Sequence, residues 1–462
     1  MRATEVTRGL LAAAVAVGVV ASALVLGGGA VPSTTAEPGP ASSGTVTSGT
    51  VAPGTVAELG RAVPRADLQR TADVQRLLGV WASAVRTDDT TALATVLDPA
   101  ADVGFGAAET ARAANLAGVP LSDWGYEITA DPAAVVPPDV VQRLGADEVW
   151  APPVVLRYAV AGADATSTRK PVGLVVARRG DTWRLVGDAD LAGYGRTTWR
   201  GPWDFGPVLV RSSAQGVVLG HPGQEADLDR LAAELATAVP AVTSLWGPDW
   251  SQKVLVVLAG TQPELEALVG SAFSGVGVAA VTTADAVDRA ARTATGVRVV
   301  VNPATLDQLT AATLRIVLRH ELTHVAARPV TADQAPLWML EGFADYSGYR
   351  GSGTSTDRGA PAVAALVGAN GPPDSLPTDA DFAPSDETSR AELAYQLAWT
   401  FTSFLADTRG EDALLAAYRA VAAQPSPTPA QLDAELTTSL GATQAQLVTE
   451  WGRWLVARVD GG

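Results

Sequence analysis

Apolar and polar positions follow two different periods along residues 66–200. From 66 to 85, apolar side chains recur every third or fourth position, which predicts an amphipathic helix, and a shorter helix is predicted over 91–97. Beyond residue 120, runs of β-type residues predict strands. These strands are expected at 122–128, 150–160, 171–178 and 182–186. The last two form a hairpin with its turn at 179–181, so the pattern predicts a small α+β domain.

From residue 205 onward, the pattern first alternates between strands and helices and then becomes mainly helical. Strands are expected at 208–212, 216–220, 253–259 and 297–301, and helices at 225–245 and 261–269. After about residue 302 the pattern is mainly helical. This order predicts a second α+β domain over 205–460, with a mixed sheet and a mainly helical C-terminal half. The stretch 199–203, interrupted by Gly and Pro, is expected to be the junction.

The amino terminus carries a long apolar run. Arg2 and Arg8 precede an uncharged segment over 9–26, which as a helix would span roughly 27 Å, close to the thickness of a bilayer core. The arginines place the amino terminus in the cytoplasm and the following chain outside it. We therefore expect residues 1–30 to be a signal-anchor transmembrane helix in the cell membrane. A small-residue cleavage site leaves a cleaved signal and a secreted protein as the alternative.

Composition narrows the class of protein further. Residues 31–65 are dominated by Pro, Ser, Thr, Gly and Ala, which predicts a disordered linker. The chain has 49 acidic and 33 basic residues, and this net charge of −16 argues against a nucleic-acid partner. Cysteine is absent, which excludes disulfides, thiolate metal sites and thiol nucleophiles. Only three histidines are present, His221, His320 and His324.

Two of these histidines form a metal-binding pattern, His320-Glu321-Leu-Thr-His324. The surrounding segment, 310–328, has a helical apolar face and is followed by Pro329. At about 100° per residue, the two imidazoles lie one turn apart on the same side of the helix, where both can bind one Zn²⁺. Glu321 lies beside them, where a carboxylate can take up and return a proton during hydrolysis. The alternative is that so short a pattern arose by chance.

A second segment, Glu341-Gly-Phe-Ala-Asp345, strengthens the metal interpretation. Open zinc sites use three protein ligands, and two histidines with one glutamate are a common set. Glu341 follows His324 by 17 residues, which leaves room for a loop and a second helix that returns its carboxylate to the metal. Asp345 lies one turn beyond Glu341, where it can hold the other ring nitrogen of a ligand histidine.

The two segments together resemble the gluzincin zinc peptidases, and most of all the bacterial extracytoplasmic peptidase MA-like domains. This resemblance implies a zinc metallopeptidase over 205–460 that acts on a peptide or protein substrate. It also implies that strand 297–301 is the edge strand beside the active-site helix, open to an extended peptide. Tyr395 resembles the tyrosine that donates to the oxyanion in the aminopeptidase branch, although an interfacial aromatic residue is an equal alternative. The segment 296–302 lacks that branch's amine-binding glutamate, which favours an endopeptidase.

Other functions stay open on the sequence alone. The layout of 66–200 resembles the cone-shaped domain of nuclear transport factor 2, but no histidine lies in this range, so a spacer or binding role is expected. The Gly- and Pro-rich stretch after Tyr349 is expected to cover the cleft. The main rival is a membrane-anchored envelope binding or structural protein with a catalytically silent peptidase-like domain. A zinc hydrolase acting on a non-peptide amide is a weaker alternative.

Overall fold

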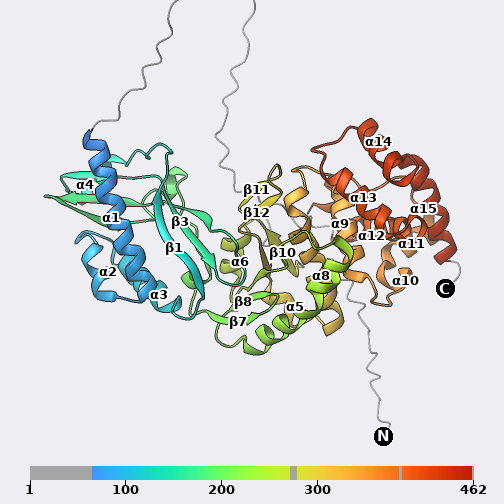
Figure 1. Ribbon diagram of the computed structural model, residues 1–462, viewed down its shortest axis with the longest axis horizontal. Coiled ribbons are helices and arrows are strands. Elements are labelled where there is room, and N and C mark those ends of the chain that lie inside the picture. Colours follow the sequence, from blue (N-terminus) through green and yellow to red (C-terminus); the bar gives the residue numbers. More distant parts are fainter. Residues whose placement is uncertain (1–64, 271–277, 384–387, 460–462) are drawn as a thin grey trace, which may run out of the picture.

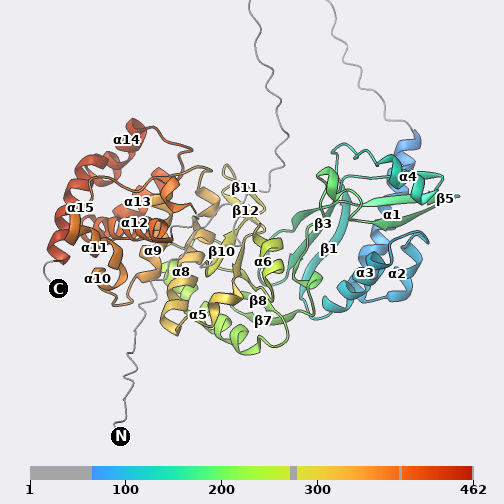
Figure 2. The same ribbon diagram turned by 180° about the vertical axis from the view of Figure 1, so that it is seen from behind.

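The computed structural model describes residues 65–270, 278–383 and 388–459, which form an elongated α+β molecule (Figure 1). Both views place the first helices at one end, the last helices at the other end and a sheet between them (Figures 1 and 2). Within the described ranges, no helix is both long enough and apolar enough to cross a bilayer. The predicted anchor at 1–30 and nearly all of the predicted linker at 31–65 lie outside these ranges and stay predictions.

The first unit contains the predicted helices followed by antiparallel strands. Its helices are α1 (Arg65–Thr87), α2 (Thr90–Val96), α3 (Val103–Asn115) and α4 (Pro138–Leu144). Its strands are β1 (Leu121–Ile128), β2 (Glu148–Trp150), β3 (Val154–Val160), β4 (Thr168–Val172), β5 (Val175–Arg179) and β6 (Thr182–Gly187). They form two three-stranded sheets, β1-β3-β4 and β2-β5-β6. The predicted hairpin is confirmed as β5–β6, and Gly180 in its turn has a φ of 58°, a conformation that glycine adopts without strain.

The second unit is built on a five-stranded mixed sheet. Its order is β10-β13-β9-β8-β7, with parallel pairs among β13, β9 and β8 and an antiparallel strand at each edge. These strands are β7 (Leu209–Ser213), β8 (Gly216–Gly220), β9 (Val254–Leu258), β10 (Ala280–Thr283) and β13 (Arg298–Val301). A small hairpin of β11 (Ala286–Asp288) and β12 (Thr293–Thr295) connects β10 to β13. The helices α5 (Glu225–Trp246), α6 (Gln262–Val269) and α7 (Pro303–Leu306) complete this half.

The prediction that 297–301 is the edge strand is wrong. This segment is β13, which is paired on both sides, and β10 is the edge strand. Val299, Val300 and Val301 are all buried, so both faces of β13 are covered, and its pairing with β10 and β9 covers both edges. Such a continuous apolar run is typical of an interior strand of a parallel sheet.

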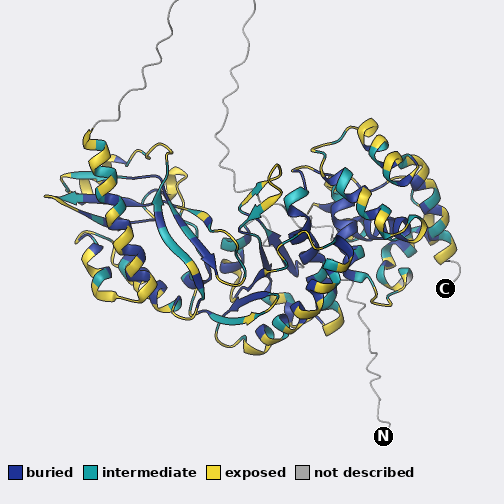
Figure 3. Cartoon of the chain, viewed as in Figure 1, coloured by how far each residue is buried: buried dark blue, intermediate teal, exposed yellow. Residues whose placement is uncertain are grey.

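The two units share a hydrophobic core. Val218 and Val256 point from the central sheet toward α5, whereas their neighbours Val217 and Val257 belong to the core of the first unit. Because side chains alternate between the faces of a strand, helices cover one face of the sheet, and the first unit together with α6 covers the other. The junction is also fixed, since Trp203 is buried within the first unit's core. Figure 3 shows the buried residues concentrated in this sheet and in the helices beside it.

The C-terminal half is helical, as predicted. Its helices are α8 (Ala311–Ala327), α9 (Leu337–Tyr349), α10 (Thr356–Gly359), α11 (Pro361–Asn370), α12 (Thr388–Arg409), α13 (Glu411–Ala422), α14 (Pro429–Leu440) and α15 (Gln444–Val459). Two glycines let α9 lie close to its neighbours. A Cβ on Gly342 would lie 2.6 Å from the carbonyl oxygen of Ala398 in α12, and one on Gly348 would lie 2.8 Å from that of Ile316 in α8. A side chain at either position would push α9 away from α8 or α12.

Candidate metal centre

The two histidines of the sequence pattern lie on α8, in the interior of the protein. Thr310 caps this helix, because its hydroxyl accepts a hydrogen bond from the Thr313 amide. Leu318 and Leu322 anchor the apolar face of α8 in the core. His320 is 0% exposed and His324 is 7% exposed, so both imidazoles are held by packing as well as by the helix.

Glu341 reaches the histidines from α9, whose first amide is capped by a residue from a distant segment. The N-cap residue of α9 is Pro336, which makes no side-chain cap. Instead, the amide of Leu337 donates to Oδ1 of Asp379 at 2.9 Å. Asp379 belongs to the short 3₁₀ helix η5 (Asp379–Phe382), within the stretch that the sequence analysis expected to cover the cleft. This contact fixes the start of the helix that carries Glu341.

The three predicted ligands converge on one point. Nε2 of His320 and Nε2 of His324 lie 3.0 Å apart. Oε2 of Glu341 lies 3.3 Å from the first and 3.6 Å from the second, yet it accepts no hydrogen bond. Among the residues described, these side chains form the one group of three His or carboxylate residues whose ligand atoms, all within 4.8 Å of one another, can hold a metal ion.

Asp345 contacts this group from behind. Its Oδ1 lies 2.8 Å from Nδ1 of His320, on the side of the ring away from the other histidine. Burial alone would lower the pKa of His320, but Asp345 and Glu341 raise it well above its usual value. Burial likewise opposes ionisation of Glu341, but the charges of His324 and His320 lower its pKa to about 2. The site therefore favours an ionised Glu341.

Glu321 is fully buried beside the histidines and contacts the edge strand. Its Oε2 accepts a hydrogen bond of 2.6 Å from the hydroxyl of Thr282 in β10, and its Oε1 has no hydrogen-bond partner. Thr282 could not be found from the sequence, because a threonine in a short strand after a Gly-rich segment carries no motif. Only the antiparallel pairing of β10 with β13 brings it to α8.

Tyr395 and His221 lie in different elements of the second unit. Tyr395 is 3% exposed on α12, and its ring lies edge-on to Phe382 with centroids 5.1 Å apart. Its role as an oxyanion donor stays a prediction. His221 lies outside the group of three, in the loop between β8 and α5. Its Nε2 lies 2.9 Å from both carboxylate oxygens of Glu264, and its Nδ1 lies 3.0 Å from the carbonyl oxygen of Pro207.

The geometry of the three predicted ligands fits a zinc ion. A tetrahedral zinc ion with bonds of about 2.0–2.1 Å keeps its ligand atoms roughly 3.3 Å apart. The observed separations of 3.0, 3.3 and 3.6 Å are close to this value. A buried carboxylate oxygen without a hydrogen bond, facing two imidazole nitrogens, is a costly arrangement that a cation would stabilise.

No family model matches the chain, and no curated protein matches it. Among solved structures, it is similar to an M1 zinc metallopeptidase from Deinococcus radiodurans, with 16% identity and a TM-score of 0.34 over 60% of this chain and 58% of the other. A mutant of that enzyme bound to a Tyr-Ser-Ala substrate gives 17% identity and a TM-score of 0.36 over 63% and 60% of the two chains.

These structural neighbours are zinc metallopeptidases, but the similarity is too low to show that this chain belongs to their family. The chain also spans only 58% to 60% of the length of the solved structures it matches. The resemblance of residues 66–200 to nuclear transport factor 2 is not confirmed by these findings and stays a prediction.

Proposed function

We propose that the protein is a zinc-dependent peptidase. The observation that carries this proposal is the convergence of His320, His324 and Glu341 inside the protein, with the unpartnered Oε1 of Glu321 beside them. In this proposal His320, His324 and Glu341 hold the zinc ion. Bound zinc would supply Lewis-acid chemistry, which polarises a carbonyl oxygen and lowers the pKa of water.

The chain's own residues then have distinct roles. Glu321 takes up a proton at Oε1 from the attacking water and returns it to the leaving amine. Asp345 accepts a hydrogen bond from the Nδ1–H of His320, which leaves the Nε2 lone pair directed at the site. Tyr395 would donate to the oxyanion of the tetrahedral intermediate.

The type of peptidase and its location in the cell are proposed from the sequence. The absence of an amine-binding glutamate in 296–302 supports an endopeptidase. The apolar run at 9–26 supports attachment to the cell membrane with the catalytic unit outside the cytoplasm, or secretion after cleavage. The substrate would be an extended peptide or protein segment beside the edge strand, which is β10.

The first test is the metal content of the full chain, purified in mild detergent and measured by elemental mass spectrometry. We expect about one zinc per chain in the wild type and in Glu321→Gln, and none in His324→Ala. We expect Glu321→Gln to lose peptide hydrolysis by about 10²- to 10⁴-fold, because general-base catalysis contributes this much. Full activity in Glu321→Gln would refute the mechanism. Zinc binding without cleavage of any peptide in a library would favour a silent binding protein instead.

A further inference from the structure

The edge strand contacts the proposed general base directly. The hydroxyl of Thr282 lies 2.6 Å from Oε2 of Glu321 and 3.2 Å from the carbonyl oxygen of the same residue. A hydroxyl has one proton to donate, and a separation of 2.5–2.7 Å is typical of an O–H donor facing a charged oxygen. The hydroxyl proton therefore goes mainly to the carboxylate.

Packing on both faces of β10 holds Thr282 in this position. Thr282 is paired with Val299 of β13, and its side chain points toward α8. Val281, the preceding residue, points to the opposite face and packs in a separate apolar cluster with Val300 and Leu265. Thr282 is also 5% exposed and β-branched, so its side chain has few alternative rotamers.

The first unit fixes the C-terminal end of the edge strand, next to Thr282. Asp285, two residues beyond β10, forms an ion pair with Lys170 and accepts a hydrogen bond from Thr168. Both partners belong to β4, so the first unit holds the chain three residues beyond Thr282, which is the last residue but one of β10. Lys170 and Asp285 are both mostly buried, with side chains 17% and 16% exposed. The contact between Thr282 and Glu321 is therefore part of a rigid arrangement.

We propose that Thr282 is a positioning residue that fixes the carboxylate of Glu321 and leaves Oε1 as the atom that carries the proton. This inference rests on the proposed function. Oε2 is occupied by the threonine hydroxyl, whereas Oε1 is buried and has no hydrogen-bond partner. Without the hydroxyl, the carboxylate rotates, and either oxygen can turn away from the substrate. A misoriented base slows the proton transfer without changing how substrate binds.

The test compares three variants in the full chain. Thr282→Val removes the hydroxyl and keeps the shape of the side chain, and Thr282→Ser keeps the hydroxyl. Thr237→Val is the matched control, since the hydroxyl of Thr237 on α5 also donates to a glutamate carboxylate, at 2.6 Å from Oε1 of Glu234. We expect Thr282→Val to lower kcat about 10- to 100-fold, the effect of losing a hydrogen bond to a charged group, with KM and zinc content unchanged. Thr282→Ser should restore kcat to within about threefold, and Thr237→Val should match the wild type.

A crystal structure of zinc-loaded Thr282→Val gives a readout that does not depend on activity. We expect the Glu321 carboxylate to be rotated or to occupy two orientations. A wild-type kcat in Thr282→Val, or an equal loss in Thr282→Ser, would overturn the inference. If the wild type binds zinc but cleaves no peptide, the proposed function fails, and the crystal structure still decides the question. An unchanged Glu321 orientation there would overturn the positioning role.

Discussion

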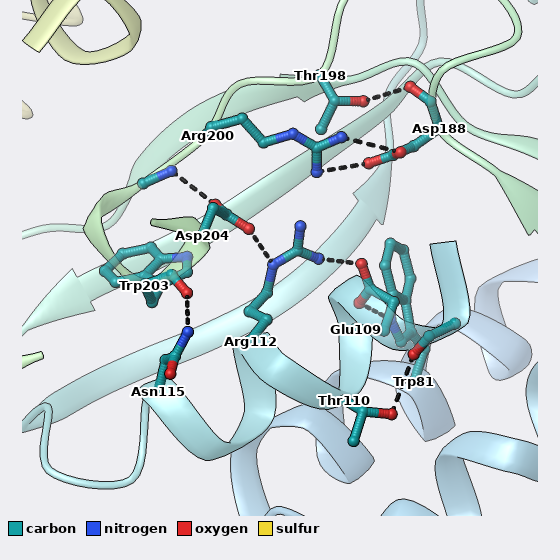
Figure 4. Close-up of polar contacts among 12 residues, drawn as sticks. Trp81, Glu109, Thr110, Arg112, Asn115, Asp188, Thr198, Arg200, Trp203 and Asp204 are labelled. Atoms are coloured by element: carbon teal, nitrogen blue, oxygen red, sulfur yellow. Dashed lines mark hydrogen bonds and ion pairs between the residues drawn. The ribbon is translucent and has the colours of Figure 1, made fainter. Parts of the chain in front are cut away.

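Two clusters of buried charged residues, one in each unit, are built in opposite ways. In the first unit, Glu109 accepts a hydrogen bond of 2.7 Å from the indole of Trp81 and forms an ion pair with Arg112 (Figure 4). Arg112 also donates to Asp204 at 2.7 Å, and Asp204 in turn caps the backbone of Gly201. Every charge in this network has a partner of opposite sign within the protein.

The cluster on α8 and α9 also brings opposite charges together, since His320 lies beside Asp345 and Glu341, but its hydrogen bonds are incomplete. Two imidazole nitrogens face each other, and oxygens of Glu341 and Glu321 are buried without a hydrogen bond. Most unpartnered atoms of the first unit are neutral, such as the hydroxyl of Tyr126 and the indole N–H of Trp203. The two that belong to charged groups, on Arg70 and Asp188, lie in side chains that form ion pairs with Glu148 and Arg200. An unpartnered charge costs far more in the interior than a neutral group does. We therefore take a buried cluster whose charged groups all have partners as structural, and one with unpartnered carboxylate oxygens as a site that needs a ligand.

The largest expected effect on stability comes from breaking the complete network. Arg112→Met leaves Glu109 and Asp204 unpaired, and removing one partner of a buried ion pair costs about 3–5 kcal/mol. We expect urea denaturation to show this loss while the zinc content stays at the wild-type value. Arg76→Met is the control, because Arg76 has a side chain that is 68% exposed in its pair with Asp73. Its loss should stay below about 1 kcal/mol. Equal losses of unfolding free energy in the two variants would show that burial of an ion pair does not determine its contribution to stability.

Zinc should affect only the incomplete cluster. Free zinc at a hundredfold excess over its Kd should raise the free energy of unfolding by about 2.7 kcal/mol, provided that zinc binds only the folded state. Arg112→Met should show the same increase and His324→Ala none, measured by thermal unfolding with and without a chelator. An increase in His324→Ala would place the zinc elsewhere and would contradict the proposed ligand set.

The sequence predicts the second cluster better than the first because of how each is assembled. His320 and His324 share one helix, and Glu341 follows on the next, so local periodicity is enough to bring them together. The first network joins Arg112 to Asp204, which is 92 residues away. Helix α3 itself was not predicted, because its Ala- and Gly-rich sequence has a weak apolar pattern. No local rule connects such distant residues.

The same limit explains why the edge strand was misidentified. Strand order depends on pairing between segments, and β10 pairs with β13 across the intervening hairpin. The apolar residues of β13 predict a strand but do not say whether one or both of its edges are paired. Thr282, which contacts Glu321, could be found only after this order was known.

The smallest expected effect is at His221, a histidine that has a hydrogen-bond partner at both ring nitrogens. Its hydrogen bond with Glu264 raises the pKa of His221 above 6.5, although burial opposes this. Protonated His221 therefore stabilises the folded protein fully below about pH 6.5, and this contribution is lost as the pH rises through the raised pKa. In zinc-saturated protein, we expect the stability advantage of wild type over His221→Gln to fall by about 1 kcal/mol between pH 6 and pH 9. Zinc content should be equal in the two proteins, since a histidine paired with Glu264 has no nitrogen left for a metal. A pH-independent difference, or a loss of zinc, would place His221 with the incomplete cluster instead.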